Sequence, residues 1–313
     1  MKFVRKCKSE DYATKYLLEV PVKSQEPNGE KKSIEALFIH LPEREDGKPK
    51  SILCLSSQVG CFYDCKMCAN RELPFYRSLT PYEINQQIEL VLMHNGNIGK
   101  IKEEKAVEYA FIGIGEPLFG MNVIYAIQKY NESIPGVIIP DTRFSIATVG
   151  EKGTIKRLTD YSYKYPIRLE LSLHFPNDSL RNQWINSQYP GRKRDPILNI
   201  ENMLKETERF LDKKGGKATL NYAIINGTNN TPERLEELVS LLKGREERFY
   251  VKVMELNYTS SLVESHKRDL NTEKTYSVEE FKGELEKRGV HAILFKSKGV
   301  DIRAGCGMMA VRD

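Results

Sequence analysis

Three cysteines close together in the sequence constrain this chain more than any other feature. Cys61, Cys65 and Cys68 are separated by three and then two residues in the segment CFYDCKMC. One short loop with this spacing can wrap an iron-sulfur cluster and supply three of the four thiolates that normally hold such a cluster. Three ligands leave one iron open. The segment therefore predicts a 4Fe-4S cluster with a free coordination position.

Zinc is the alternative metal for closely spaced cysteines. Zinc sites usually combine two pairs of ligands, and no second Cys or His pair follows this segment at a suitable distance. We therefore favour the iron-sulfur cluster. Its open iron can chelate the amino and carboxylate groups of S-adenosylmethionine (SAM), and a reduced cluster can pass an electron to the SAM sulfonium and release a 5′-deoxyadenosyl radical. The loop thus indicates radical SAM chemistry.

A second segment, GIGEP at residues 113–117, stands at the end of an expected strand. A small residue such as Gly115 lets the backbone approach a ligand there, and Glu116 is a candidate to bind the SAM ammonium. Taken alone, such a strand end is more often an ordinary turn. Its position one strand after the cysteine loop favours the SAM interpretation.

The order of the expected elements predicts an α/β fold. Apolar strand candidates alternate with helical patterns, for example the segment TPYE that caps a helix beginning at Pro81. Such alternation produces a parallel sheet covered by helices, and right-handed crossovers curl it into a full or partial (β/α) barrel. The strand candidates are residues 107–112, 143–147, 167–171, 218–225, 250–256 and 291–295.

Ahead of the barrel, residues 34–40 and 51–55 indicate a β-hairpin that leads into the cysteine loop. We therefore divide the chain into an N-terminal extension, residues 1–50, and a radical SAM catalytic domain, residues 51–313. The chain has no run of about 18 apolar residues, and its basic start lacks the apolar stretch of a signal peptide. These features predict a cytoplasmic protein without a membrane segment.

Charge and cysteine content leave the partner open. A net charge of +5 agrees with an anionic partner such as RNA, although many enzymes with small anionic substrates have a similar charge. Six cysteines are few for a disulfide framework in a chain of 313 residues. Five of them stand in segments that suggest chemistry. Cys7 alone stands apart, and we interpret it as an ordinary packed cysteine.

Several segments together resemble the dual-cysteine radical SAM RNA methyltransferases, the RlmN/Cfr group, which methylate adenosine carbons. The resemblance extends over most of the chain, and its first and last segments are the most specific. The segments are CLSSQVGC at 54–61, GEP at 115–117, SLH at 172–174, PND at 176–178, GTN at 227–229 and GVDIRAGCG at 299–307.

The resemblance implies a role for particular residues. Cys306 would carry the methyl group, Cys54 would be the resolving cysteine, and Glu35 would be the proton-accepting glutamate. One position departs from the family, because Ala147 stands where a serine of the SAM pocket is expected. The residues implied to contact SAM are Gly115, Glu116, Ser172, His174 and Asn229.

The two extra cysteines matter because an aromatic carbon, such as adenine carbon 2 or 8, is not nucleophilic enough to take a methyl cation directly from SAM. In the implied route, the Cys306 thiolate takes a methyl group from one SAM, and the deoxyadenosyl radical from a second SAM removes hydrogen from that methyl group. The methylene radical adds to the ring and a base removes the ring proton. Cys54 then attacks Cys306, which releases the product and leaves a disulfide.

Three functions compete. The leading one is methylation of an adenosine in RNA, with the basic triplet at 192–194 as candidate phosphate contacts and an electron donor such as flavodoxin or ferredoxin. The segment before Ile34 is too short for the N-terminal accessory domain with which family members grip RNA. The second hypothesis therefore applies the same methyl transfer to a free nucleotide, a small metabolite or a peptide. A non-catalytic iron-sulfur protein that binds RNA or acts as a sensor is disfavoured, because Cys54 and Cys306 would then have no use.

Overall fold

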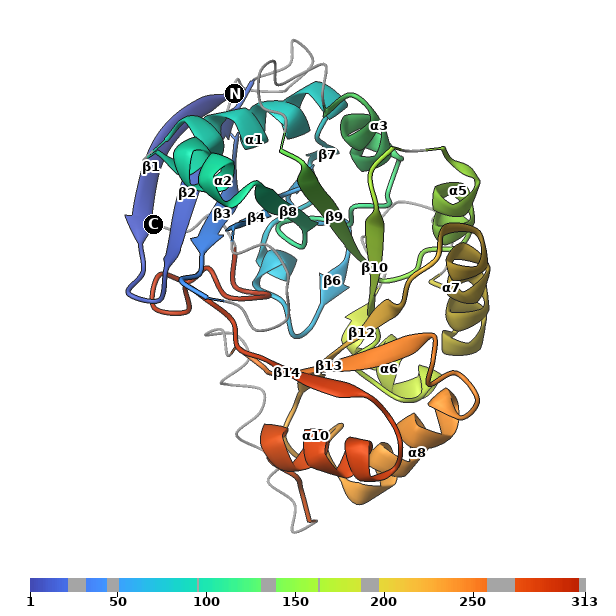
Figure 1. Cartoon of the computed structure of the whole chain (residues 1–313). Helices are drawn as coiled ribbons and strands as arrows, with labels where there is room; N and C mark the ends of the chain where they lie inside the picture. The colour runs from blue at the N-terminus through green and yellow to red at the C-terminus, as the bar shows by residue number, and fades with distance from the viewer. Residues whose placement is uncertain are drawn as a thin grey trace.

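A computed structural model of the chain describes residues 1–21, 32–43, 51–94, 96–130, 139–162, 164–186, 197–257 and 274–309. Its centre is a curved ten-stranded sheet with helices packed along the outer side (Figure 1). The strands lie in the order β1-β2-β3-β4-β8-β9-β10-β12-β13-β14. Within the described ranges, β1 and β14 each pair on one side only, so the expected barrel is a partial one.

Antiparallel strands form the first part of the sheet. They are β1 (Lys2–Lys8), β2 (Ala13–Val20), β3 (Lys32–His40) and β4 (Ser51–Cys54). The antiparallel pairing of β3 with β4 confirms the expected hairpin. The sequence did not indicate β1 and β2. The reason for β1 is that it is an edge strand with mostly exposed, basic side chains, so it lacks the apolar alternation that marks a strand.

Parallel strands form the rest of the sheet, which confirms the α/β fold. From the pairing of β4 with β8 onward, neighbouring strands of the sheet run parallel. These strands are β8 (Ala106–Phe111), β9 (Asp141–Thr148), β10 (Ile167–Ser172), β12 (Ala218–Ile224), β13 (Phe249–Glu255) and β14 (Ala292–Phe295). The helices are α1 (Pro81–Met93), α2 (Asn97–Glu104), α3 (Asn122–Gln128), α5 (Thr154–Asp160), α6 (Asp178–Trp184), α7 (Ile200–Lys214), α8 (Pro232–Leu242) and α10 (Val278–Lys287). No helix in the described part of the chain combines the length and apolar character needed to cross a bilayer.

The two faces of the sheet differ in polarity. Along β10, Leu169 and Leu171 are buried in the main apolar core together with residues of the helices. Neighbouring residues of a strand point to opposite faces. Glu170 and Ser172 therefore point to the inner side, where both line a cavity, and Lys252 of β13 lines the same cavity. The helices cover the apolar face, and the inner face of the sheet carries polar and charged side chains.

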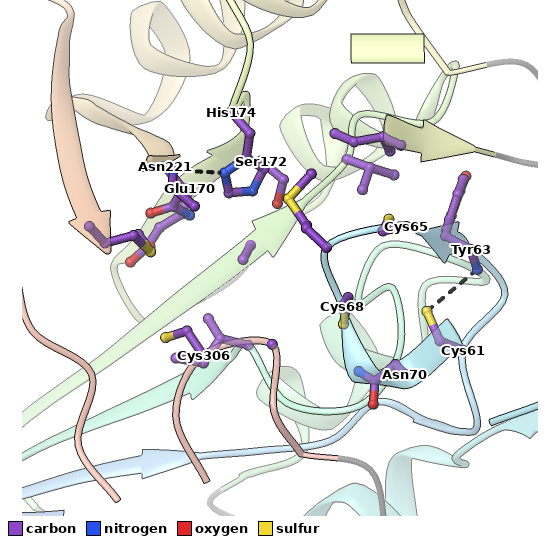
Figure 2. A pocket seen from close by; sticks show the side chains of 18 of the residues that line it. Cys61, Tyr63, Cys65, Cys68, Asn70, Glu170, Ser172, His174, Asn221 and Cys306 are labelled. Carbon is purple, nitrogen blue, oxygen red and sulfur yellow. Dashed lines mark hydrogen bonds between the residues drawn. The ribbon is translucent and has the colours of Figure 1, made fainter. Parts of the chain in front are cut away.

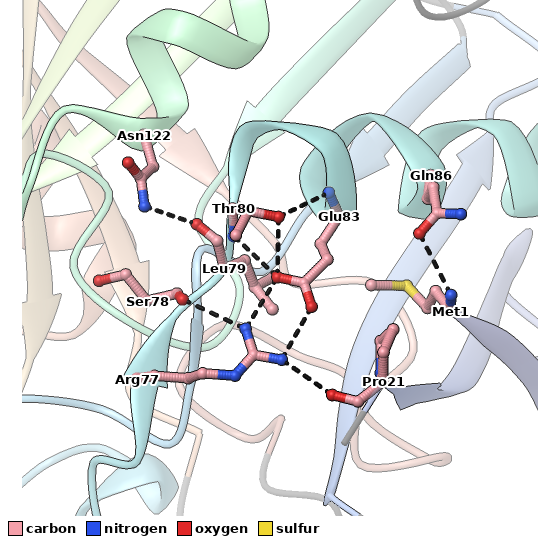
Figure 3. Close-up of polar contacts among 9 residues, drawn as sticks. All are labelled: Met1, Pro21, Arg77, Ser78, Leu79, Thr80, Glu83, Gln86 and Asn122. Atoms are coloured by element: carbon pink, nitrogen blue, oxygen red, sulfur yellow. Dashed lines mark hydrogen bonds and ion pairs between the residues drawn. The ribbon is translucent and has the colours of Figure 1, made fainter. Parts of the chain in front are cut away.

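The start of α1 joins three parts of the chain (Figure 3). Thr80 and Glu83 form the expected capping box: Thr80 Oγ1 accepts from the Glu83 N–H at 3.2 Å, and Glu83 Oε2 accepts from the Thr80 N–H at 2.8 Å. Arg77 donates to both Glu83 oxygens at 2.8 Å and to the Pro21 carbonyl at 3.2 Å. Burial raises the pKa of Glu83, but the hydrogen bonds from Arg77 and Thr80 outweigh it and lower that pKa. These contacts fix the chain after the cysteine loop against α1 and the end of β2.

Candidate active site

A cavity opens at the carboxyl ends of the parallel strands, the edge where open α/β sheets bind ligands. It brings together segments that are far apart in the sequence. Ala147, at the position where the family pattern has a serine, also lines it. The expected site residues that line it are Cys61, Cys65, Cys68, Gly115, Glu116, Ser172, His174 and Cys306, several of which are labelled in Figure 2.

The cysteine loop is tied to both sides of this cavity. Its short strand β6 (Asp64–Cys65) pairs with β11 (Ile185–Asn186), which follows α6. On the other side, the Ala69 N–H donates to the Gly307 carbonyl at 2.8 Å. That bond joins the cysteine loop directly to the segment that carries Cys306.

The three thiols of the loop lie within electrostatic reach of one another. Burial raises the pKa of the Cys65 thiol well above its usual value, and charge on Cys68 and Cys61 raises this pKa further. Metal ions favour the deprotonated form of such ligands. Gly60 precedes the loop with a φ of 70°, and a Cβ there would lie 2.0 Å from the Pro74 carbonyl oxygen, so glycine is required at this position. Among the described His, Cys, Asp and Glu side chains, no group of three is already arranged to hold a metal ion.

Glu116 is held at the bottom of the cavity by a tight turn. Gly115 has a φ of 105°, and a Cβ there would lie 2.5 Å from the Gln58 Cβ, so only glycine fits. The Glu116 carboxylate accepts from Thr148 Oγ1 at 2.6 Å and from the Val149 N–H at 3.0 Å. Burial raises the pKa of Glu116 to about 7, although these bonds oppose the rise. The carboxyl group is therefore about half-ionised near pH 7, and Glu116 lines the cavity.

His174 is neutral and fixed in one orientation. Its Nδ1 accepts from the Ala223 N–H at 3.1 Å, which assigns the ring proton to Nε2. Burial lowers the pKa of His174 to about 3, and the nearby charge of Arg181 lowers it in the same direction. The Asn229 Nδ2 donates to the His174 carbonyl at 2.8 Å and to the Ala223 carbonyl at 2.7 Å, and Asn229 Oδ1 accepts from the Ile225 N–H at 2.7 Å. Asn229 thus orders the backbone behind His174, and a direct contact between Asn229 and SAM stays a prediction.

Cys306 is half-buried in the loop that follows β14. Asn257 Nδ2 donates to the Cys306 carbonyl at 2.9 Å, and the Cys306 N–H donates to Ser297 Oγ at 3.4 Å. Earlier in the loop, the Gly299 N–H donates to both carboxylate oxygens of Asp11 at 2.9 Å. Asp11 lies in the turn between β1 and β2, and Figure 1 shows the C-terminal segment beside the ends of these strands. The N-terminal strands therefore help to hold the loop that carries Cys306.

Cys54 ends β4 and is buried, but it is not among the described residues that line the cavity. It packs in a small apolar cluster with Leu37 of β3 and Ala304 of the Cys306 loop. Burial raises the pKa of the Cys54 thiol, and charge on Cys306 is the next largest cause of the rise. The structure therefore places Cys54 against the loop that carries Cys306, and both cysteines are free thiols.

Glu35 is placed differently from the other expected residues. It is buried on β3, two residues before the partner of Cys54 in the sheet, and it is not among the described residues that line the cavity. Its Oε1 lies 3.1 Å from the Nζ of Lys15, an ion pair between β2 and β3. Proton acceptance by Glu35 stays a prediction.

Sequence reasoning missed a group of charged residues on the inner face of the sheet. Glu170 Oε2 lies 2.7 Å from Lys252 Nζ, and Glu170 Oε1 lies 3.1 Å from Arg168 Nη2. Arg168 also pairs with Glu108 of β8. The signal was present, because charged residues alternate with apolar ones in the segments RLEL at 168–171 and VKV at 251–253. Such alternation marks one face of a strand as polar.

These features can be compared with known proteins. The model of the radical SAM superfamily matches residues 55–242, more than half of the chain. The chain belongs to the radical SAM superfamily. A probable dual-specificity RNA methyltransferase RlmN of Dictyoglomus turgidum is 32% identical to it over 287 residues, which are 86% of this chain and 74% of that protein. The dual-specificity RNA methyltransferase RlmN of Aliarcobacter butzleri is 29% identical over 321 residues, which are 100% of this chain and 81% of that protein.

A solved structure is similar over nearly the whole of this radical SAM protein. It is the crystal structure of a radical SAM methyltransferase from Sphaerobacter thermophilus, with a TM-score of 0.75 and 25% identity. The match covers 99% of this chain and 81% of that one. The chain is therefore a homologue of radical SAM methyltransferases and is related to the RlmN proteins.

Membership of the superfamily implies an iron-sulfur cluster and SAM, and the residues present fit both. The donor set in the loop is three thiols, the ligand type that holds iron-sulfur clusters. Beside them the cavity is lined by Glu116, whose carboxylate has the charge that an ammonium group requires, and by Gly115.

Proposed function

We propose that this protein is a radical SAM methyltransferase that methylates an sp2 carbon, carbon 2 or 8, of an adenine in RNA. One observation carries the proposal: Cys54 packs with Ala304, two residues before Cys306, and Cys306 lines the same cavity as the three loop cysteines. A methyltransferase that moves the methyl group straight from SAM to its substrate has no need for this second pair of thiols. Similarity to the RlmN proteins supports RNA as the substrate.

In this proposal Cys61, Cys65 and Cys68 hold a 4Fe-4S cluster, and Gly115, Glu116, Ser172 and His174 form the SAM pocket. When bound, the cluster and SAM supply a methyl group and a 5′-deoxyadenosyl radical. Glu116 would bind the ammonium of SAM. The neutral His174, with its proton on Nε2, would be a hydrogen-bond donor to the cofactor.

The two further cysteines divide the remaining chemistry between them. The Cys306 sulfur takes the methyl group and, after loss of one hydrogen atom, joins that carbon to the ring. Glu35 is the proposed acceptor of the ring proton, and the unpaired electron left on the ring would return to the cluster. The Cys54 sulfur would then attack the Cys306 sulfur, so that a sulfur-sulfur bond forms as the carbon-sulfur bond breaks, and the released carbon would take up a proton to become the methyl group. Each turnover would leave a disulfide that an external reductant must open.

The partners and boundaries follow from the same proposal. Flavodoxin or ferredoxin would supply electrons in the cytoplasm. The basic triplet at 192–194, the candidate phosphate contact, lies outside the described residues. Residues 51–313 would form the catalytic domain, with residues 1–50 as an extension. The bond between Asp11 and Gly299 gives this extension a further task, which is to steady the Cys306 loop.

The test is incubation of anaerobically reconstituted protein with SAM labelled in its methyl group, a reductant and total RNA. We expect label in RNA, and after digestion in a methyladenosine. The Cys306→Ala variant with its cluster intact is the matched control and should leave RNA unlabelled. Label only in a small molecule or peptide would overturn RNA as the substrate, and turnover without label in any product would overturn the methyltransferase assignment.

A further inference from the structure

The cavity holds a buried cation that the reaction above does not use. Lys252 projects from the inner face of β13, its side chain is 13% exposed, and its Nζ lies 4.7 Å from the centre of the Phe295 ring. Glu170 Oε2 receives its hydrogen bond at 2.7 Å. A lysine in such a place loses most of its contact with water, which is costly unless the charge has a partner.

Lys252 ends a chain of charges that crosses the sheet from β8 to β13. Glu108 pairs with Arg168, Arg168 with Glu170, and Glu170 with Lys252. Of these groups, Glu170 and Lys252 line the cavity, whereas Arg168 and Glu108 line a separate pocket. Buried ion pairs contribute little to stability when apolar residues could fill the same space. A role in the cavity is therefore a better explanation for this chain of charges than stability is.

Cys306 is a reactive group of the cavity that Lys252 lines. The strand that carries Lys252 also leads to Asn257, whose side chain donates to the Cys306 carbonyl at 2.9 Å. Burial raises the pKa of the Cys306 thiol, and the strongest opposing influence is Lys252, which outranks the repulsion from Glu170. The anionic form of Cys306 thus has one strong cationic neighbour among the described residues that influence it.

We propose that Lys252, held in place by Glu170, is the cation that stabilises the Cys306 thiolate while this sulfur takes its methyl group. The inference rests on the proposed function and deepens it. In the step concerned, the thiolate electron pair forms a bond to the SAM methyl carbon, the carbon-sulfonium bond breaks, and S-adenosylhomocysteine leaves. Negative charge on Cys306 is lost in this step, and the thiol proton has gone to solvent beforehand. The ammonium lowers the energy of the charged sulfur and needs to transfer no proton.

The test measures methylation of Cys306 alone, before any radical is formed. Cluster-loaded protein receives SAM labelled in its methyl group, without reductant, and the label on the Cys306 peptide is followed by mass spectrometry. The variants are Lys252→Gln, which keeps a hydrogen-bond donor for Glu170 but removes the charge, and Lys252→Arg, which keeps the charge. An exposed lysine of α7, Lys205, supplies the control variant Lys205→Gln. A second readout is the rate at which iodoacetamide alkylates unmethylated Cys306.

We expect Lys252→Gln to slow both reactions about tenfold, the effect of losing an opposite charge beside an ionising group. Lys252→Arg should recover most of the rate, and iron content and the KM for SAM should change less than about twofold because neither depends on this charge. Unchanged rates in Lys252→Gln, or equal losses in Lys252→Gln and Lys252→Arg, would overturn the proposal. If Cys306 takes no methyl group even in the unsubstituted protein, the proposed function fails, and alkylation still decides the role of Lys252.

Discussion

Cys54 packs against the loop that carries Cys306, yet the chain holds the two cysteines in opposite ways. Cys54 belongs to a strand that is paired on both sides, with β3 and with β8. Cys306 lies in a loop. Hydrogen bonds from the Asn257 side chain and to Ser297 Oγ hold its backbone, and bonds at Gly299 and Gly307 attach the rest of the loop. A sulfur that must meet a methyl donor and then a ring has to move. A sulfur that only attacks its neighbour can stay fixed.

The charges around the two thiols differ as well. Burial raises the pKa of both. For Cys54, negative charge on Cys306 and on Glu108 raises the pKa further before Lys252 opposes the rise. For Cys306, Lys252 is the strongest influence after burial, and it lowers the pKa. Cys306 is therefore the easier of the two to ionise. This order suits a mechanism in which Cys306 reacts first and Cys54 last.

The largest effect is expected from loss of the cluster, because the reactions of both Cys54 and Cys306 depend on it. The triple substitution of Cys61, Cys65 and Cys68 by alanine should abolish cluster binding, because no other thiol lies in the loop. Reconstituted protein should hold about four iron per chain and the variant almost none, measured by iron and sulfide analysis. Cys7→Ala serves as the control. Stoichiometric zinc without iron in the unsubstituted protein would contradict the cluster assignment.

Substitution of Cys54 should lower the stability of the protein more than substitution of Cys306. Cys54→Ser places a hydroxyl in an apolar cluster and should lower the free energy of unfolding by about 2 kcal/mol. Cys306→Ser should cost less than about 1 kcal/mol, because Cys306 is only half-buried in a polar loop. Urea unfolding of the two variants checks both values. Equal losses would mean that the two cysteines are embedded alike and that the contrast drawn here is wrong.

A smaller effect is expected from a substitution that alters the surroundings of Cys306 but not those of Cys54. Asn257→Ala removes the donor to both the Cys306 carbonyl and Ser297 Oγ. We expect methylation of Cys306 to slow about tenfold, because a reacting group that is loosened by about an ångström loses its alignment. Asn202→Ala, at an exposed position of α7, is the control. The alkylation rate of Cys54 should not change, and a parallel loss at Cys54 would show that Asn257 supports the whole sheet edge instead.

The smallest effect concerns the cofactor that serves both cysteines. The pKa of Glu116 is about 7, so its carboxylate gains charge as the pH rises through that value. Affinity for the SAM ammonium should therefore strengthen about fourfold between pH 6.5 and 8. Calorimetric titration of cluster-loaded protein with SAM measures this change. Glu116→Gln should bind weakly at both pH values, and an equally steep pH dependence in that variant would assign the titration to another group.

Local sequence patterns were sufficient to predict much of the fold. The capping box at Thr80 and Glu83 located α1, and apolar runs located the parallel strands, because these signals lie within a few neighbouring residues. β1 and β2 were missed. The charged strand β1 lies at the sheet edge, and only its pairing with β2 orders it.

In the candidate site, the sequence predicted the reactive residues but not the contacts that depend on tertiary packing. The three loop cysteines are defined by spacing, and the cavity contains them as expected. Lys252 and Glu170 meet only because β10 and β13 are brought together through β12, so their pairing is a property of the sheet. The amide of Asn229 is occupied by backbone groups, which no sequence motif indicates. Motifs identified reactive residues, and tertiary packing decided what surrounds them.

The most direct test of the two-cysteine account asks which variant becomes trapped on its substrate. Cys54→Ala should accumulate protein tethered to RNA through Cys306 and a one-carbon bridge, because the carbon is delivered but the link is never broken. Cys306→Ala should form no tether, because it cannot accept the methyl group. Denaturing gels and peptide mass spectrometry of both variants, after turnover with SAM and reductant, decide the matter. If the two variants behave alike, with no adduct in either, the division of labour between Cys54 and Cys306 is wrong for this protein.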